Sequence, residues 1–165
     1  MGATMPGNAS SPRIATPLDF TWKTRVRWTG PQATTVYSGK HSFAVGAAAG
    51  FAPGDPPPSA VEYLLGALGA DLTASFERHA ARQGIVVDAA EMVLSGRLEN
   101  PLVYLGVVGE TGSPGFAWIG GVLYVSADAD EATLRAVWET TLARSPLYNT
   151  LKPGVALDLE LRLMP

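Results

Sequence analysis

One segment limits what this chain can fold into more than any other: residues 60–83 repeat apolar side chains at the spacing of an α-helix. A run of prolines ends just before it, at Pro58, and excludes helix there. Ser59 and Glu62 match a capping box, in which each side chain satisfies a free backbone N–H of the other residue. Gly84 follows as a helix-ending residue. We therefore predict one long helix at the centre of the fold.

This helix is apolar nearly all round. Between Glu62 and Glu77 its only charged side chain is Asp71, and such a helix is buried on more than one side. Gly66 and Gly69 each cost about 1 kcal/mol relative to Ala in a helix interior, which indicates close contact with another backbone. A single chain of this size has few other elements that could cover the helix, so we expect a second copy of the chain to pack on it across a dimer axis.

The rest of the chain reads mainly as strands. We expect a strand from Phe20 to Trp28, a hairpin of residues 33–38 and 41–45, strands at 85–98, 102–108 and 116–126, and a last strand at 155–163. A second capping box, Asp128 with Glu131, starts a helix to Arg144 that Ser145-Pro146 interrupts. The order β-β-β-α-β-β-β-α-β predicts an α+β domain.

Composition narrows the class of protein. Residues 1–18 are rich in Pro, Gly, Ser and Ala, so we expect a disordered arm followed by a single domain over residues 19–165. The net charge is −3 and the charges are scattered, so the sequence does not predict a basic surface that binds nucleic acid. No apolar run reaches the roughly 18 residues of a membrane span. The first residues do not form a signal peptide, and the simplest interpretation is a cytoplasmic protein.

The chain contains no cysteine, which excludes disulfides, thiolate nucleophiles and cysteine-ligated metals. His41 and His79 are the only histidines, and no HxH or HExxH spacing supports a metal site. No G-x-S-x-G or phosphate-binding loop occurs. We therefore expect no metal and no cofactor. His41 fits a hairpin surface, and His79 fits the polar edge of the helix or a dimer interface. The four tryptophans fall on apolar faces, where core packing explains them: Trp22, Trp28, Trp118 and Trp138.

Asp71 is the candidate site residue that the helix itself points to. A buried, unpaired carboxylate would cost several kcal/mol or take up a proton, so it needs a partner or a solvated cleft. Ser75 lies one helical turn on, and Arg25 or Arg27 could reach it from the first strand. Asp71 either faces water or forms a structural ion pair, or it contacts a ligand or takes part in catalysis.

Two segments resemble the OsmC/Ohr family of organic-hydroperoxide-resistance proteins. The stretch PSAVEYLLGALGADLTASFERHAARQGI resembles the family's central helix, and LARSPLYNTLKPGVALDLEL resembles its second cysteine segment with the last strand. The resemblance implies an intertwined homodimer in which two long helices pack back to back between β-sheets. It also implies a peroxidatic cysteine that attacks the peroxide and a resolving cysteine that closes a disulfide, with an Arg and a Glu poising the thiolate.

Position by position, the resemblance predicts a protein without that chemistry. Asp71 stands at the peroxidatic position and Ser145 at the resolving position. The family's helper Glu falls at Val61 here, and Glu62 follows it. Arg25 or Arg27 corresponds to the family's Arg. Neither a carboxylate nor a hydroxyl performs reversible peroxide chemistry, which needs sulfur.

Three functions remain open. The first is a non-peroxidase that binds a small hydrophobic or amphipathic molecule at the dimer interface. The second is an enzyme of altered chemistry in which Asp71 acts as general acid or base beside Ser75, His79 or an Arg. The third is a dimeric stress-response protein without a ligand. We favour the first, because no complete catalytic set is visible in the sequence.

Overall fold

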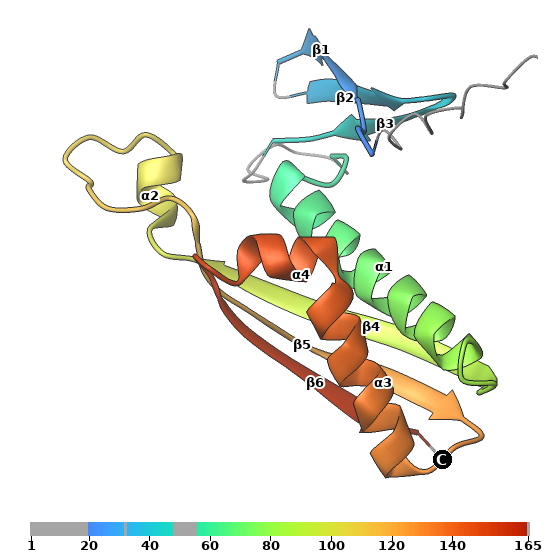
Figure 1. The fold of residues 1–165 in the computed structure, drawn as a ribbon. Coiled ribbons are helices and arrows are strands. Elements are labelled where there is room, and N and C mark those ends of the chain that lie inside the picture. The colour runs from blue at the N-terminus through green and yellow to red at the C-terminus, as the bar shows by residue number, and fades with distance from the viewer. Residues whose placement is uncertain (1–19, 32, 48–55, 165) are drawn as a thin grey trace, which may run out of the picture.

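A computed structural model of the chain describes residues 20–31, 33–47 and 56–164. The expected arm at residues 1–18 lies outside this part. Two separate three-stranded sheets are present (Figure 1). The first consists of β1 (Arg25–Gly30), β2 (Ala33–Ser38) and β3 (His41–Val45), and the second of β4 (Val87–Leu98), β5 (Phe116–Ala127) and β6 (Ala156–Leu163). The helices are α1 (Ala60–Ala81), α2 (Pro101–Tyr104), α3 (Glu131–Arg144) and α4 (Pro146–Leu151). The predicted α+β class is confirmed.

The second sheet carries the core. β4 pairs with β5 in antiparallel orientation and β5 with β6 in parallel orientation. Helices α1, α3 and α4 lie over one face of this sheet (Figure 1). The buried apolar side chains of α1, α3, β5 and β6 meet in this layer and form one cluster: Leu68, Leu72, Phe76, Ala80, Ile119, Leu123, Val125, Leu134, Val137, Trp138 and Leu161. The face of β5 that carries Ile119, Leu123 and Val125 is therefore the one that the helices cover.

The first sheet lies apart from this core, beyond the N-terminal end of α1 (Figure 1). The predicted hairpin is present, with Gly39 at a φ of 59° in its turn. The predicted first strand is too long, because β1 begins only at Arg25. Trp22 and Trp28 are 84% and 72% exposed, so core packing within one chain is the wrong explanation for these two tryptophans.

Helix α1 begins and ends for the predicted reasons. The Ser59 backbone N–H donates to Glu62 Oε2 over 2.7 Å, and the Glu62 backbone N–H donates to Ser59 Oγ over 3.3 Å. These contacts form the capping box. Gly84, at a φ of 75°, turns the chain away from the helix into β4. A Cβ on Gly69 would lie 3.3 Å from Leu94 Cδ1 in β4. This glycine thus accommodates the chain's own sheet.

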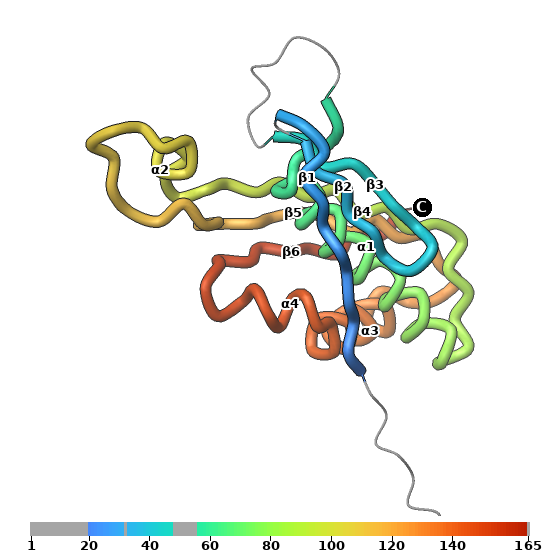
Figure 2. The backbone as a smooth tube through the Cα atoms, turned by 90° about the horizontal axis from the view of Figure 1, so that it is seen from above, coloured from blue at the N-terminus to red at the C-terminus, as the bar shows by residue number. Residues whose placement is uncertain are grey.

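Two predicted elements are wrong. Residues 102–108 do not form a strand: Asn100 caps the short helix α2, and Gly106 and Gly109 at positive φ turn the chain back. Residues 99–115 form an arm that projects beyond the sheet (Figures 1 and 2). The second capping box is also wrong, because the N-cap of α3 is Asp130, whose Oδ1 accepts from the Thr133 backbone N–H at 2.9 Å. Thr133 also donates its hydroxyl to Asp130, and Asp128 has no such partner at that spacing.

Candidate functional site

Asp71 and Ser145, which the sequence resemblance predicts at the family's two cysteine positions, are in direct contact. The Ser145 hydroxyl donates a hydrogen bond to Asp71 Oδ2 over 2.5 Å. Asp71 lies in the middle of α1 and is half-buried, whereas Ser145 lies at the junction of α3 and α4 and is 1% exposed. The contact therefore joins the central helix to the C-terminal part of the chain.

Local sequence places Ser145 at this junction. Pro146 lacks a backbone N–H and ends α3 at Arg144, as predicted. Pro146 is also the first residue of α4, where its fixed φ is favourable. Ser145 caps this new helix, because its Oγ accepts a hydrogen bond from the Tyr148 backbone N–H at 2.9 Å. The Ser145 hydroxyl therefore accepts from α4 and donates to α1, and both uses hold the junction in place.

Asp71 has a second, weaker contact on its own helix. The Ser75 hydroxyl lies 3.5 Å from Asp71 Oδ1, and Arg78 Nη2 donates to Ser75 Oγ over 2.8 Å. Ser75 thus stands between the Asp71 carboxylate and the Arg78 guanidinium. In the part of the chain that the structure describes, no Arg or Lys lies within ion-pair distance of Asp71.

The other predicted site residues lie elsewhere in the protomer. Arg25 stacks over the Tyr37 ring, 4.0 Å from its centroid, in the first sheet. Neither Arg25 nor Arg27 forms an ion pair with Asp71 within one chain. Glu62 serves the capping box, and hydrogen bonds from the Ser59 backbone and hydroxyl lower the pKa of this carboxyl. The structure therefore brings Asp71, Ser145 and Ser75 together and leaves the other candidates apart.

His79 is only 6% exposed within a single chain, so the expectation that it lies on a polar edge of the helix is wrong. Burial lowers the pKa of this imidazole, and the nearby charges of Arg144, Arg82 and Arg78 lower it further. Arg144 was missed in the sequence. Its signal was its position directly before Ser145, at the end of a helix that packs against α1. His41 is exposed in the hairpin.

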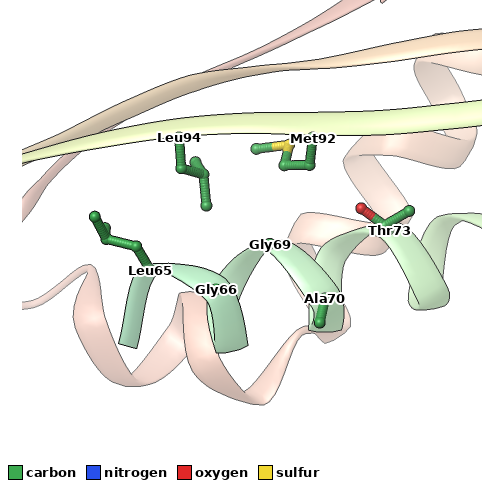
Figure 3. A pocket seen from close by; sticks show the side chains of 7 residues that line it. All are labelled: Leu65, Gly66, Gly69, Ala70, Thr73, Met92 and Leu94. Carbon is green, nitrogen blue, oxygen red and sulfur yellow. The ribbon is translucent and has the colours of Figure 1, made fainter. Parts of the chain in front are cut away.

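A groove of about 420 Å³ opens between α1 and β4 (Figure 3). Met92 and Leu94 hang from β4 toward the helix, and Leu65 reaches up from the helix beside them. Gly66 and Gly69 form the helix surface beneath, where larger side chains would take up the space. The groove is apolar on its sheet side and does not include Asp71, so it is distinct from the Asp71–Ser145 pair.

These side chains permit proton transfer and binding, and they do not permit a thiol redox cycle. The half-buried Asp71 carboxylate can accept a proton, and its protonated form can donate one. The Ser145 hydroxyl is buried and fully engaged, which makes it unsuited to attack a substrate. Among the described residues, no three His, Asp or Glu side chains gather as metal ligands, and no helix is long and apolar enough to cross a membrane.

Comparisons with known proteins agree on one fold. A family model described as OsmC-like protein matches residues 53–160. An OsmC-like protein from Mycoplasma pneumoniae shares 16% identity at a TM-score of 0.76, covering 90% of this chain and 100% of that one. The organic hydroperoxide resistance protein OhrB of Bacillus subtilis shares 20% identity at a TM-score of 0.59, covering 87% and 98%. An OsmC-like protein of unknown function from Vibrio cholerae shares 12% identity at 0.67, covering 87% and 99%. No curated protein sequence matches the chain.

Proposed function

Because the chain belongs to the OsmC family, we propose that it is a homodimeric, cytoplasmic, non-peroxidase member that binds a small hydrophobic or amphipathic molecule. One observation carries the proposal: an oxygen pair, Asp71 and Ser145, stands in hydrogen-bond contact where the family pattern has a sulfur pair. Peroxide reduction by that pattern needs a thiolate that is oxidised and then restored. A chain without cysteine has no such group.

Exposed apolar surface supports the dimer. Single chains in solution rarely expose large contiguous apolar patches, and such patches mark interfaces. The first sheet leaves Val26, Trp28 and Phe43 exposed, and Trp22 just before it is exposed as well. A three-stranded sheet needs a covered apolar face to be stable. Little of the same chain covers the apolar face of β1–β3. The outward face of α1 carries the exposed small residues Ala67, Ala70 and Ala74, over which a second helix can approach closely.

The groove between α1 and β4 is the proposed ligand site. Its volume of about 420 Å³ lies within the range of small-molecule sites, which are mostly apolar and concave. Leu65, Met92 and Leu94 supply the apolar contact. Ala70 belongs both to the groove and to the outward face of α1, so a second copy packed on that face would close the open side of the groove.

The ligand proposal is tested with N-phenyl-1-naphthylamine, an uncharged probe whose fluorescence rises in apolar sites. We expect the wild-type protein to bind it and Gly66→Leu, which fills the groove, to bind about tenfold more weakly, a loss of roughly 1.4 kcal/mol. Ala132→Leu adds the same side chain on α3, at an exposed position away from the groove, and should bind like wild type. Equal binding by the wild type and Gly66→Leu would remove the groove as the ligand site.

The dimer is tested by light scattering at micromolar concentration. We expect a mass twice the 17.3 kDa of one chain. Ala70→Glu places a charge on the outward face of α1 and should shift the protein toward monomer, whereas Ala132→Glu on α3 should not. A natively folded wild-type monomer would contradict the proposed assembly.

An enzyme of altered chemistry is the second candidate, favoured by the short Ser145–Asp71 hydrogen bond. In that case Asp71 would act as general acid or base, with the half-exposed carboxylate as the working group. Hydrolysis of p-nitrophenyl esters that is lost in Asp71→Asn and kept in Glu77→Gln, an exposed carboxyl on the same helix, would favour this candidate. No turnover with these esters leaves the binding function preferred.

A further inference from the structure

The groove between α1 and β4 has one polar side chain in its lining, that of Thr73. The other lining residues are aliphatic residues, glycines and one methionine: Leu65, Gly66, Gly69, Ala70, Met92 and Leu94. Leu65 and Leu94 stand at one end of the groove, and Thr73 and Met92 stand at the other (Figure 3). The two ends therefore differ in chemistry, because one is purely aliphatic and the other offers a hydroxyl.

The Thr73 hydroxyl has no hydrogen-bond partner in the part of the chain that the structure describes. Three threonines in α3 and α4 donate their hydroxyl to the backbone carbonyl four residues earlier, over 2.7–2.9 Å: Thr140, Thr141 and Thr150. Thr73 is half-buried, and Figure 3 shows its oxygen on the side that faces β4. This hydroxyl is therefore available to a bound molecule, as a donor and as an acceptor.

The described residues that line the groove carry no charge. The Asp71 carboxylate lies outside the groove and accepts from Ser145. Glu77, exposed one helical turn beyond Thr73, is negative. A carboxylate or phosphate bound at the polar end would lose its water shell without gaining a cationic partner, and Glu77 would repel it. The groove therefore disfavours an anionic head group.

We propose that the ligand is an aliphatic molecule with one uncharged hydroxyl group, which forms a hydrogen bond with Thr73 while the alkyl chain lies along Leu65 and Leu94. This inference rests on the proposed function and names the class of molecule that the groove takes. A ligand hydroxyl can use both the donor and the acceptor capacity of Thr73, whereas a carbonyl can use only the donor.

The dimensions of the groove suit such a molecule. From Leu65 to Thr73 the helix axis advances about 12 Å, which accommodates an alkyl chain of medium length. Met92 has a flexible thioether side chain that adapts to the shape of its neighbours. One polar contact that fixes orientation, within a mainly apolar lining, is the usual composition of a small-molecule site.

Displacement of N-phenyl-1-naphthylamine tests the head group with three molecules that share one alkyl chain: 1-octanol, octanoate and octylamine. At pH 7.5 octanoate is an anion and octylamine is a cation. We expect 1-octanol to displace the probe, and octanoate and octylamine each to bind about tenfold more weakly, because their charges must be desolvated. Binding of either charged molecule as tightly as 1-octanol overturns the uncharged head group.

Matched threonine variants test the residue. Thr73→Val removes the hydroxyl at nearly constant size and should weaken 1-octanol binding about fivefold, the effect of one lost hydrogen bond between uncharged groups. Thr73→Ser keeps the hydroxyl and should bind like wild type. Thr140→Val makes the same change on α3, away from the groove, and should also bind like wild type. An unchanged affinity in Thr73→Val, or an equal loss in Thr140→Val, contradicts the role of Thr73.

The probe separates this inference from the function on which it rests. A wild-type protein that binds neither the probe nor 1-octanol contradicts the ligand site itself, and the inference fails with it. A wild-type protein that binds the probe, loses it in Gly66→Leu and binds all three octyl molecules equally keeps the ligand site and contradicts only the head group. Valine and threonine have similar helix propensities, so Thr73→Val should remain folded, which circular dichroism checks.

Discussion

Ser145 Oγ donates to Asp71 Oδ2 over 2.5 Å, and the two residues are 74 positions apart in the chain. The same oxygen accepts the Tyr148 backbone N–H. One buried hydroxyl therefore fixes both the start of α4 and its position against α1. The sequence resemblance predicts that these two residues stand at the family's cysteine positions, where family members can form a covalent link.

Ser145→Ala should destabilise the protein by about 2 kcal/mol. It removes a hydrogen bond to a carboxylate, worth about 1.5–3 kcal/mol, and an N-cap, worth about 1 kcal/mol. Both interactions use the Ser145 Oγ atom, so the two contributions do not simply add. Asp71→Asn should cost about 1 kcal/mol, because an amide oxygen still accepts from Ser145 without the assistance of charge. Urea unfolding of both single variants and the double variant gives their coupling energy. A coupling near zero would show that the hydrogen bond contributes nothing to stability.

The wild-type protein should show no catalytic turnover of cumene hydroperoxide with dithiol reductants, because it has no sulfur at either position. Slow, stoichiometric consumption through methionine oxidation is the only peroxide loss we expect. A coupled steady-state assay measures this, with an active cysteine-containing family member as the reference. Turnover comparable to the reference would contradict the proposal that this protein is not a peroxidase.

The variant with both Asp71→Cys and Ser145→Cys should form a disulfide on mild oxidation. The Ser145 hydroxyl contacts the Asp71 carboxylate, so cysteines at these positions would place their thiols near each other, and a disulfide needs Cβ atoms about 3.5–4.5 Å apart. Thiol titration gives an unambiguous count, because the chain has no other cysteine. The matched control joins Asp71→Cys with Ser38→Cys in β2, and it should keep two free thiols. Two free thiols in the first variant would contradict the expectation that these two positions can be joined covalently.

His79 should make the protein less stable as the pH falls below neutral. The pKa of the folded His79 is lowered from the ordinary value of 6.5, so above pH 6.5 the imidazole is neutral in both states. Below that value the unfolded chain takes up a proton that the folded chain does not, and stability falls until the folded pKa is reached. Unfolding of wild type and His79→Gln between pH 7.5 and pH 5, in buffers without phosphate or carboxylate, should show a steeper loss for the wild type. His41→Gln should keep the wild-type slope.

Gly121→Ala should destabilise the sheet by about 1–3 kcal/mol, the cost of overpacking a dense core. A Cβ at this position would meet the Val93 backbone oxygen and the Leu94 side chain of β4. These neighbours belong to a paired strand and cannot move independently of it. Gly154→Ala has nothing within 4 Å and should be nearly neutral in the same chemical unfolding experiment.

Local signals in the sequence predicted the elements that local contacts determine. Ser59 and Glu62 form their capping box within one turn, and Pro146 ends α3 whatever surrounds it. The arm was mistaken for a strand because residues 102–108 are largely aliphatic, although Asn100-Pro101 already indicated a helix start. Asp128 and Asp130 are both suitable residue types for the N-cap of α3. Asp130 is the observed N-cap, and it also accepts a hydrogen bond from the Thr133 hydroxyl.

The site was only partly predictable, because it joins distant segments. Asp71 stood out as the one charge in an apolar helix, and the resemblance to the family paired it with Ser145. The effect of the Arg144 charge on the His79 pKa depends on how α3 packs against α1, and no spacing in the chain encodes it. Gly69 was assigned to a second copy, whereas its close neighbours are Met92 and Leu94 of β4.

The projecting arm gives the chain a natural place to be divided. Val108 at its tip is 99% exposed, and the arm is held by its own hydrogen bonds, such as that from Asn100 Nδ2 to Glu110 Oε2 at 2.9 Å. A protease that cuts there would leave two pieces, joined by the β4–β5 pairing from Val87–Ala127 to Leu98–Phe116. The nicked molecule would stay folded, and the same tip would tolerate an inserted domain or new chain ends.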